Sequence, residues 1–233
     1  MILRSKFESQ VEILKEGLQA AGKLVEKAIT LATEALVKKD PDLAEQVLEV
    51  EKEINQHERD MESLCFKILL QQQPVAKDFR FVSSALKMIT DMERIGDQAT
   101  NIAEICLLLA EEDYITNLDQ IAEMGEIAVS MVHNSIQAFV TKDKALARSV
   151  IKQDDAIDKL FVSKKDELFD LMIKDPQNSR QAIDLLMIAK YYERIGDHAE
   201  NIAEWTIYSI TGVQKRDAKN KRKAEKKASQ ENV

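Results

Sequence analysis

The sequence predicts an all-α protein made of two tandem three-helix bundles that are related by an internal pseudo-repeat. Only 6 Gly and 3 Pro occur among 233 residues, roughly a third of the share usual in soluble proteins. Sheets joined by tight turns need many positions that tolerate positive φ, which excludes sandwiches, barrels and Gly-rich nucleotide-binding sheets. The 45% apolar and 32% charged residues suit amphipathic helices, which bury one stripe and expose the rest.

Proline and capping residues divide the chain into six expected helices. Pro41, Pro74 and Pro176 fall between long helical patterns, and proline is tolerated only at or before the start of a helix. The segments at 116–119 (TNLD) and 141–143 (TKD) add two breaks with capping residues. The expected helices span 2–38, 41–72, 78–112, 117–141, 143–174 and 178–212.

Apolar periodicity is clearest in the second and third of these helices. From Leu43 to Ile68, and again from Phe81 to Leu109, apolar residues recur at alternating steps of three and four. This spacing is typical of the seam of a helical bundle.

The internal repeat sets the number of bundles. The segment ERIGDQATNIAE at 93–104 recurs as ERIGDHAENIAE at 193–204, and the segment at 37–55 matches that at 140–158 with 7 identities in 19 residues. The sequence therefore predicts a tandem duplication of one three-helix unit, with short connections between antiparallel helices. The expected units are a first bundle at 1–112, a second bundle at 117–212 and a basic, disordered tail at 213–233.

The repeated segment carries acidic and amide residues along one side of its helix, away from the apolar seam. At about 100° per residue they lie within about 80° of one another. They are Glu93, Asp97, Asn101 and Glu104 in the first copy and Glu193, Asp197, Asn201 and Glu204 in the second, which adds Glu200. The preceding helix adds Glu51 and Asn55 in the first copy and Asp154 and Asp158 in the second. Like charges one turn apart destabilise a helix, so this duplicated pattern suggests a bound cation.

Carboxylates on two neighbouring helices can offer several oxygens to a hard or borderline cation. The stripes contain no histidine, which favours iron, manganese or magnesium over copper. The predicted cofactor is therefore a divalent or trivalent metal ion, with zinc also among the candidates.

A local ion pair is an equal alternative to a metal. Arg94 and Arg194 precede Asp97 and Asp197 by three residues, so each aspartate could be neutralised on a solvated helix face.

Two glycines and one histidine lie within the same motif. Gly96 and Gly196 each cost a helix about 1 kcal/mol relative to alanine, and their matching positions predict a close approach by a neighbouring helix or a ligand. His198 has Gln98 as its counterpart and is expected to be an incidental surface residue.

Motif searches favour a protein that is not an enzyme. The chain has no GxxxxGK[ST], HExxH or GxSxG segment. It also lacks the paired Glu-x-x-His of ferritin-like di-iron bundles. A carboxylate-bridged metal-storage or redox bundle remains the alternative to a binding protein, and a purely structural helical scaffold is a third possibility.

Charge and cysteine content indicate the expected compartment and partners. The net charge of −8 divides into −13 over residues 1–212 and +5 over 213–233, and an acidic body argues against nucleic acid as a partner. Cys65 and Cys106 are expected to be buried, reduced thiols of a cytosolic protein. No signal peptide or membrane span is expected.

Three features together resemble the PhoU family, the accessory proteins of bacterial phosphate-specific transport. They are the repeated ERIGD-x-A-x-NIAE, the acidic pair one helix earlier and the QQPVAKDFR segment before the third helix. The resemblance covers roughly 7–212 and implies two three-helix bundles with surface sites that hold metal clusters in some members. The ligands it implies are Glu51, Asn55, Glu93, Asp97, Asp154, Asp158, Glu193 and Asp197. Asn55 departs from the acidic residue of the family pattern, which weakens the first site relative to the second.

The resemblance also implies a function. PhoU proteins are cytoplasmic regulators that restrain phosphate uptake and keep the phosphate-starvation regulon off when phosphate is plentiful. They link the phosphate ABC transporter, through its ATPase subunit PstB, to the sensor histidine kinase PhoR. Association with the membrane is then peripheral and occurs only through these partners, and a homodimer is expected.

Overall fold

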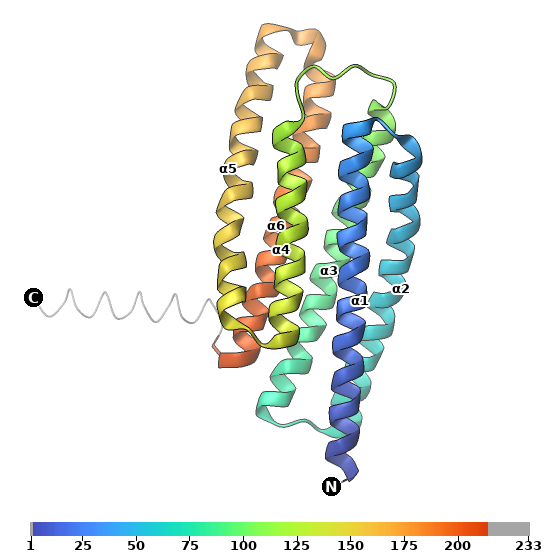
Figure 1. Ribbon diagram of the computed structural model, residues 1–233, viewed down its shortest axis with the longest axis vertical. Coiled ribbons are helices and arrows are strands. Elements are labelled where there is room, and N and C mark those ends of the chain that lie inside the picture. Colours follow the sequence, from blue (N-terminus) through green and yellow to red (C-terminus); the bar gives the residue numbers. More distant parts are fainter. Residues whose placement is uncertain (1, 214–233) are drawn as a thin grey trace, which may run out of the picture.

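The computed structural model describes residues 2–213, with side chains from Lys6 onward, and within this range it contains helices and short connections but no strand (Figure 1). Its element order confirms the predicted all-α fold and its six helices. They are α1 (Ile2–Lys38), α2 (Pro41–Gln72), α3 (Ala76–Leu109), α4 (Asp119–Thr141), α5 (Lys144–Lys174) and α6 (Ser179–Thr211), with a 3-10 turn at Pro176–Asn178 before α6. The expected basic tail lies outside the described residues, apart from Val213.

The second helix of each repeat begins in the same way. The side chain of Asp40 accepts hydrogen bonds from the backbone N–H groups of Asp42 and Leu43, at 3.0 and 3.3 Å. Asp143 caps α5 in the same manner, at 2.8 and 3.0 Å. Such a cap stabilises a helix by about 1 kcal/mol.

The third helix, expected at 78–112, begins at Ala76 and ends at Leu109, two and three residues from the expected bounds. The chain after Leu109 bonds to other helices instead of continuing its own turn. Tyr114 donates its hydroxyl to the carbonyl oxygen of Leu36 at 2.7 Å, and the side chain of Gln181 accepts from the N–H of Ile115 at 2.7 Å. These contacts are between residues far apart in sequence, which local periodicity does not report.

The six helices form two layers. Each helix of the series α2, α3, α6, α5 contacts the next, and α1 and α4 together cover one face of this layer (Figure 1). The two bundles meet through contacts of α3 with α6 and of α1 with α4. Among the described residues no helix covers the other face of the four-helix layer, and the predicted site residues are on the helices that form this layer.

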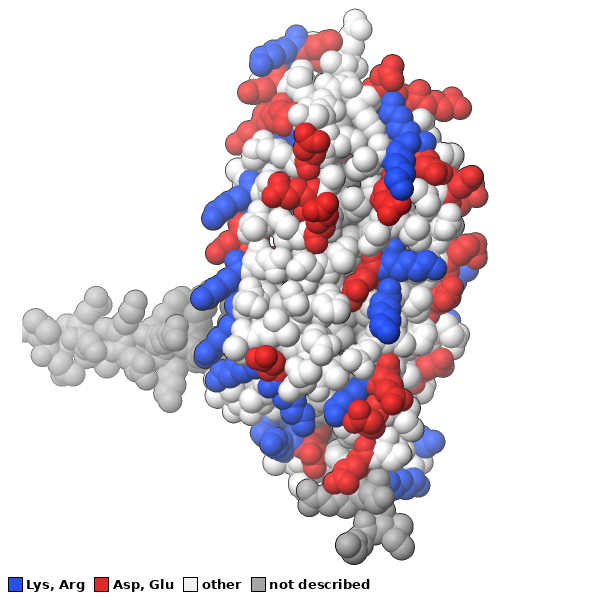
Figure 2. Space-filling model, in the orientation of Figure 1, with Lys and Arg blue, Asp and Glu red and all other residues white. Residues whose placement is uncertain are grey.

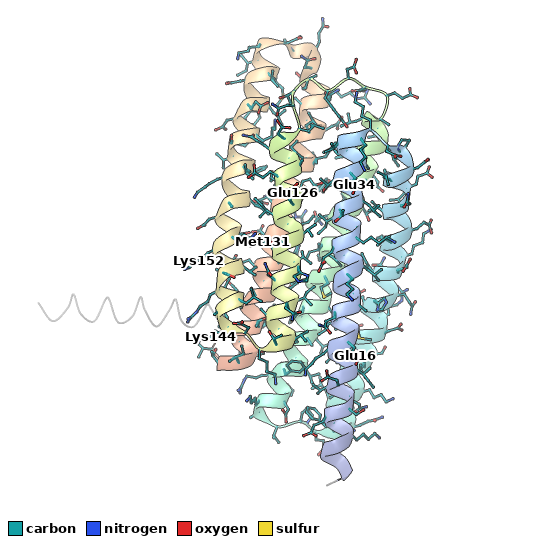
Figure 3. All side chains as sticks on the ribbon, in the orientation of Figure 1. Glu16, Glu34, Glu126, Met131, Lys144 and Lys152 are labelled. Atoms are coloured by element: carbon teal, nitrogen blue, oxygen red, sulfur yellow. The ribbon has the colours of Figure 1, made fainter. Side chains whose placement is uncertain are left out.

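Large side chains fill the interior between the layers. Tyr192 is fully buried, and the rings of Phe81 and Phe139 stack with centroids 4.7 Å apart, which joins α3 of the first bundle to α4 of the second. Along α4, Met131 is fully buried whereas Glu126 is exposed (Figure 3). Full burial of one such apolar side chain stabilises the fold by about 1.5–3 kcal/mol.

The predicted burial of the two cysteines is confirmed. Cys65 and Cys106 are free thiols in the core, and burial raises the pKa of each to about 12. They therefore behave as small apolar side chains. None of the described helices is long and apolar enough to cross a membrane.

Candidate functional site

The repeated glycines lie where two helices approach closely, as predicted. A Cβ atom placed on Gly196 of α6 would lie 2.9 Å from Oδ1 of Asp154 and 3.3 Å from Cδ1 of Ile157, both on α5. The equivalent Gly96 of α3 faces Ile54 of α2, with a nearest distance of 3.2 Å. The neighbour is thus the preceding helix of the same repeat, and the close approach brings the carboxylates of the two helices together.

Five carboxylates gather between α5 and α6 on the open face of the four-helix layer. Burial is the largest cause that raises the pKa of Asp154, and the four neighbouring carboxylates add to it, bringing the pKa to about 7. A carboxyl group surrounded by like charges holds its proton more strongly because ionisation would add repulsion. We call this group the second carboxylate cluster: Asp154, Asp158, Glu193, Asp197 and Glu200.

Two other members of the second cluster also have raised pKa values. Burial, followed by the charge of Glu193, raises the pKa of both Asp158 and Asp197. Lys190, which forms an ion pair with Glu193, and His198 oppose this rise at Asp197. The carboxylates of the cluster repel one another, and a metal cation would relieve that repulsion.

The first carboxylate cluster lies between α2 and α3. Burial raises the pKa of Glu93, and the charge of Asp97 adds to this effect, whereas the charge of Arg94 opposes it. The cluster consists of Glu51, Glu58, Glu93 and Asp97.

Arginine and asparagine side chains bind the carboxylate oxygens of this first cluster. Nε of Arg94 lies 3.3 Å from Oε2 of Glu93, and its Nη1 lies 3.2 Å from Oδ2 of Asp97. Asn55 donates its amide to Oε1 of Glu51 at 2.7 Å. The local ion pair that was the alternative to a metal is therefore present in the first repeat. In the second repeat no ion pair within 4 Å joins Arg194 to Asp197 among residues 6–213, so the two copies differ.

The donor set fits a hard cation, but the rotamers do not form a complete site. Within the part of the chain that the structure describes, no three His, Cys, Asp or Glu side chains are close enough together to hold one metal ion. All the donors of the second cluster are carboxylates, the chemistry preferred by magnesium, manganese and ferric iron. A cation could be held there by Asp154, Asp158, Glu193 and Asp197 only after their side chains rotate toward one another.

Glu58 and Glu200 belong to the clusters but were not among the predicted ligands. Glu200 falls within the acidic stripe seen in the sequence, and Glu58 lies two helical turns after Glu51, so helical spacing could have identified both. Neither has an acidic counterpart in the other repeat, where Phe161 and Thr100 stand instead.

The expectation that His198 is an incidental surface residue is wrong. Its Nδ1 lies 2.9 Å from Oδ1 of Asp91 on α3, and both side chains are less than one-fifth exposed. A second histidine also contacts a carboxylate of the other bundle: Nδ1 of His133 on α4 lies 3.1 Å from Oε1 of Glu26 on α1. Each histidine therefore joins one bundle to the other. Comparison of the two repeats does not reveal this pair, because neither partner is repeated: Asp91 corresponds to Tyr191, and His198 corresponds to Gln98.

Replacing Asp154 with asparagine is expected to remove a pH dependence of stability. The folded-state pKa of about 7 exceeds the ordinary value of 3.8, so the folded chain binds more protons than the unfolded chain between these values. This group's contribution therefore falls as the pH rises from about 4 to about 7 and stays low above that. After discounting for partial exposure, Asp154→Asn should raise the free energy of unfolding at pH 8 by about 1–2 kcal/mol and leave it little changed at pH 4.

Urea unfolding in the presence of a chelator, at pH 4 and pH 8, measures the effect. Asp166→Asn is the matched control because Asp166 is an exposed aspartate on the same helix, outside the cluster. If both variants show the pH dependence of the unmodified protein, the pKa of Asp154 in the folded chain is not raised as the structure indicates.

Known proteins are similar to this chain in both its internal repeat and its sequence. The PhoU domain matches residues 18–106 and 121–206. The chain is 37% identical over 212 residues to "Phosphate-specific transport system accessory protein PhoU homolog" of Pseudomonas putida, which covers 91% of this chain and 83% of that protein. It is 40% identical over 207 residues to the protein of the same description from Aquifex aeolicus, covering 89% and 94%.

Solved structures agree with these relatives. The crystal structure of PhoU from Pseudomonas aeruginosa superposes with a TM-score of 0.86 at 36% identity, covering 89% of this chain and all of that one. The phosphate transport system regulatory protein PhoU from Streptococcus pneumoniae superposes with a TM-score of 0.82 at 29% identity, covering 89% and 98%. Twin carboxylate clusters on a duplicated three-helix unit, together with these matches, establish that the chain belongs to the PhoU family.

Proposed function

We propose that this protein is a cytoplasmic, non-enzymatic regulator of phosphate uptake that keeps phosphate-starvation genes off when phosphate is plentiful. In this role it connects the phosphate ABC transporter, through the ATPase subunit PstB, to the sensor histidine kinase PhoR. The observation that carries the proposal is its relation, over about 90% of its length, to accessory proteins of phosphate-specific transport.

Deletion of the gene in its source bacterium tests this proposal. In a strain without any other gene of the family, loss of the protein should raise phosphate uptake and switch on phosphate-starvation genes in phosphate-rich medium. Reintroduction of the gene should reverse both changes. Normal uptake and normal expression in the deletion strain would contradict the proposed role.

Exposed apolar side chains support an adaptor with two docking ends. Phe66 and Leu70, near the α2–α3 connection, are 49% and 78% exposed, and the equivalent Phe169 and Ile173, near the α5–α6 connection, are 47% and 79% exposed. The two connections lie at opposite ends of the molecule (Figure 1). Exposed apolar groups at equivalent positions of both repeats suit contact with partner proteins, and we assign one end to PstB and the other to PhoR.

Paired substitutions separate the two ends. Phe66→Ser with Leu70→Ser should abolish capture of one partner, and Phe169→Ser with Ile173→Ser should abolish capture of the other, when purified PstB and the cytoplasmic part of PhoR are used in pull-down experiments. Each double variant is the control for the other. Capture of both partners by both variants would contradict the assignment, and loss of both partners from either variant would contradict a two-ended adaptor.

We further propose that the second carboxylate cluster binds a divalent or trivalent cation, namely iron, manganese, magnesium or zinc, and that the first cluster binds it more weakly. The mutual repulsion of the carboxylates around Asp154, which together with burial raises its pKa to about 7, supports the stronger site. The contacts of Arg94 and Asn55 with the first cluster support the weaker one, because these groups compete with a metal for the same oxygens.

Metal retention should depend on the second cluster. After incubation with one metal and desalting, elemental analysis of Asp154→Asn with Asp158→Asn should show most of the bound metal lost. The matched control is Asp166→Asn with Asp170→Asn, which removes two exposed aspartates at the same spacing on the same helix. Equal metal content in all three proteins would exclude this site. Oxidation of ferrous iron in air with several irons retained per chain would favour the metal-storage or redox alternative.

Light scattering on the eluting protein measures the predicted homodimer. The chain mass is 26.5 kDa, so a dimer elutes with twice this mass. A monomer at the concentrations used for partner capture would contradict the homodimer without affecting the adaptor proposal.

A further inference from the structure

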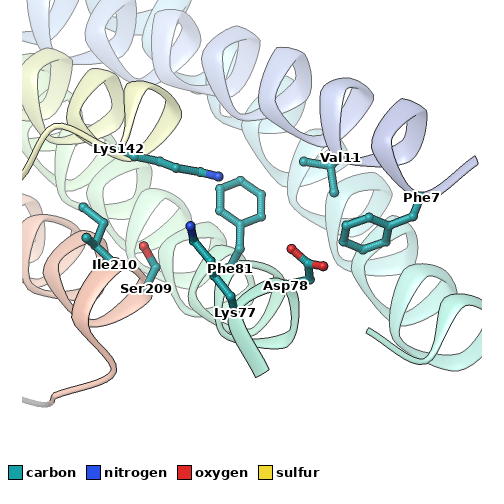
Figure 4. Close-up of a pocket in the computed structure, with 8 residues that line it drawn as sticks. All are labelled: Phe7, Val11, Lys77, Asp78, Phe81, Lys142, Ser209 and Ile210. Atoms are coloured by element: carbon teal, nitrogen blue, oxygen red, sulfur yellow. The ribbon is translucent and has the colours of Figure 1, made fainter. Parts of the chain in front are cut away.

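A pocket of about 210 Å³ lies between the two bundles at the end where α1 and α3 begin and α4 and α6 end (Figure 4). One wall is apolar and is formed by Phe7 and Val11 of α1 and Phe81 of α3. Two cationic side chains, Lys77 and Lys142, also line it. The pocket is remote from both carboxylate clusters, and no role proposed above uses it.

The two lysine side chains converge on one side of the pocket. Figure 4 shows both side chains on the same side of the pocket, and the ammonium group of Lys142 lies 5.3 Å from the centroid of the Phe81 ring. Among residues 6–213, no carboxylate lies within 4 Å of either ammonium group. Two like charges held side by side attract an anion more strongly than one.

The backbone holds Lys142 in place. It adopts a left-handed conformation, with φ of 58°, and its N–H bonds to the carbonyl oxygens at the end of α4. This left-handed conformation is common where a helix ends. It sets the point at which the Lys142 side chain leaves the backbone, next to the start of α3.

The equivalent lysine of the first repeat has an anionic partner, which indicates the charge of a ligand for Lys142. Lys39 is equivalent to Lys142 and has the same left-handed backbone, with φ of 53°, and its ammonium lies 4.9 Å from the ring of Tyr114. In that copy the protein supplies the counterion, because Oδ1 of Asp113 lies 3.2 Å from Nζ of Lys39. In the second copy Lys142 lies over the ring of Phe81 and lines the pocket, and among residues 6–213 it has no carboxylate within 4 Å of its ammonium group.

Two further features restrict the ligand. Figure 4 places the carboxylate of Asp78 between Phe81 and Val11, on the side of the pocket away from Lys142. An anionic group is therefore accepted on the lysine side and repelled on the α1 side. The first turn of α3 forms part of the wall and has no side-chain cap, so its N–H groups add to the positive potential there.

We propose that this pocket binds a small organic anion, with its phosphate or carboxylate group between Lys77 and Lys142 and its apolar part against Phe7, Val11 and Phe81. Inorganic phosphate alone would satisfy the lysines but leave the apolar wall in water. Lys and Arg side chains also gather at the lower left in Figure 2, along the edge formed by α5 and toward this end of the molecule, which favours the approach of anions.

Isothermal titration calorimetry with the full chain tests the proposal. The probes are phenyl phosphate, hexyl phosphate and hexanoate, with inorganic phosphate and phenol as partial ligands. At least one of the three organic anions should bind at millimolar concentration or below, and tighter than either partial ligand. Failure of all three to bind at millimolar concentration would overturn the proposal, as would inorganic phosphate binding as tightly as the phosphate esters.

Three variants and one control locate the bound ligand. Lys142→Gln and Lys77→Gln should each weaken binding about 10-fold or more, the usual effect of losing a charge-assisted hydrogen bond. Asp78→Asn should strengthen it several-fold, a change that general damage to the fold would not produce. Lys39→Gln removes the equivalent lysine of the first repeat and should leave the affinity unchanged. Binding that is indifferent to Lys77 and Lys142, or equally sensitive to Lys39, would overturn the assignment.

Discussion

Replacing Gly125 with alanine is expected to lower the free energy of unfolding by about 3 kcal/mol. A Cβ atom on Gly125 of α4 would collide with Oγ1 of Thr33 on α1 and lie 3.0 Å from its Cγ2 and 3.3 Å from its Cβ. Threonine is branched at Cβ and cannot turn both groups away. Displacing it would also break the 2.7 Å hydrogen bond between its hydroxyl and that of Tyr192, which is fully buried.

These costs exceed the gain of about 1 kcal/mol that alanine gives a helix over glycine. The measurement is urea unfolding followed by circular dichroism. Gly17→Ala is the matched control, because the atoms that its new methyl group would meet are at the end of the flexible Met61 side chain. That variant should be neutral or more stable by up to about 1 kcal/mol. Equal effects at both positions would show that α1 and α4 are not packed as closely as the structure places them.

Lys164→Ala is expected to destabilise the protein by about 3–4 kcal/mol. Lys164 is 0% exposed, and its ammonium donates to the carbonyl oxygen of Asn117 at 3.0 Å and to Oε2 of Glu167 at 2.9 Å. The substitution leaves a cavity and removes a donor from both oxygens. Because Asn117 lies in the connection between the bundles, we also expect faster amide hydrogen exchange in residues 110–118.

The adjacent Lys165 provides the control. Its side chain is about one-third exposed and lies 3.8 Å from an exposed aspartate, Asp166. Such surface pairs contribute little, so Lys165→Ala should change stability by less than about 0.5 kcal/mol. Similar losses for the two variants would mean that the ammonium of Lys164 does not tie the connection to α5.

The helices were predictable because their signals are local. Pro41 is the first residue of α2 and Asp143 immediately precedes α5. The step of three and four residues from Phe81 to Leu109 marks one buried face of α3. The end of α3 was not predictable because the segment after Leu109 is held by α1 and α6. Contacts of this kind join residues about 70 positions apart and leave no periodic trace.

The same division applies to the site. Spacing within one helix placed Glu93 with Asp97, and the two glycines of the repeat indicated the close approach that brings Asp154 to α6. Spacing could not decide between a metal and an ion pair, since Arg94 and Arg194 have identical positions in the two repeats. Only the packed structure shows that Arg94 binds Asp97 in the first repeat, whereas in the second repeat the ion pair is between Lys190 and Glu193.

By itself, the sequence determined a duplicated all-α chain, the faces its helices bury and the carboxylates it repeats, because these follow from the 3.6-residue period and from identities between the copies. The tertiary structure decided how the copies differ. Lys39 and Lys142 have the same local conformation, but packing places Asp113 beside the first and a pocket beside the second. Side-chain partners depend on which residues the neighbouring segments carry, and these differ between the copies even where the same helices meet.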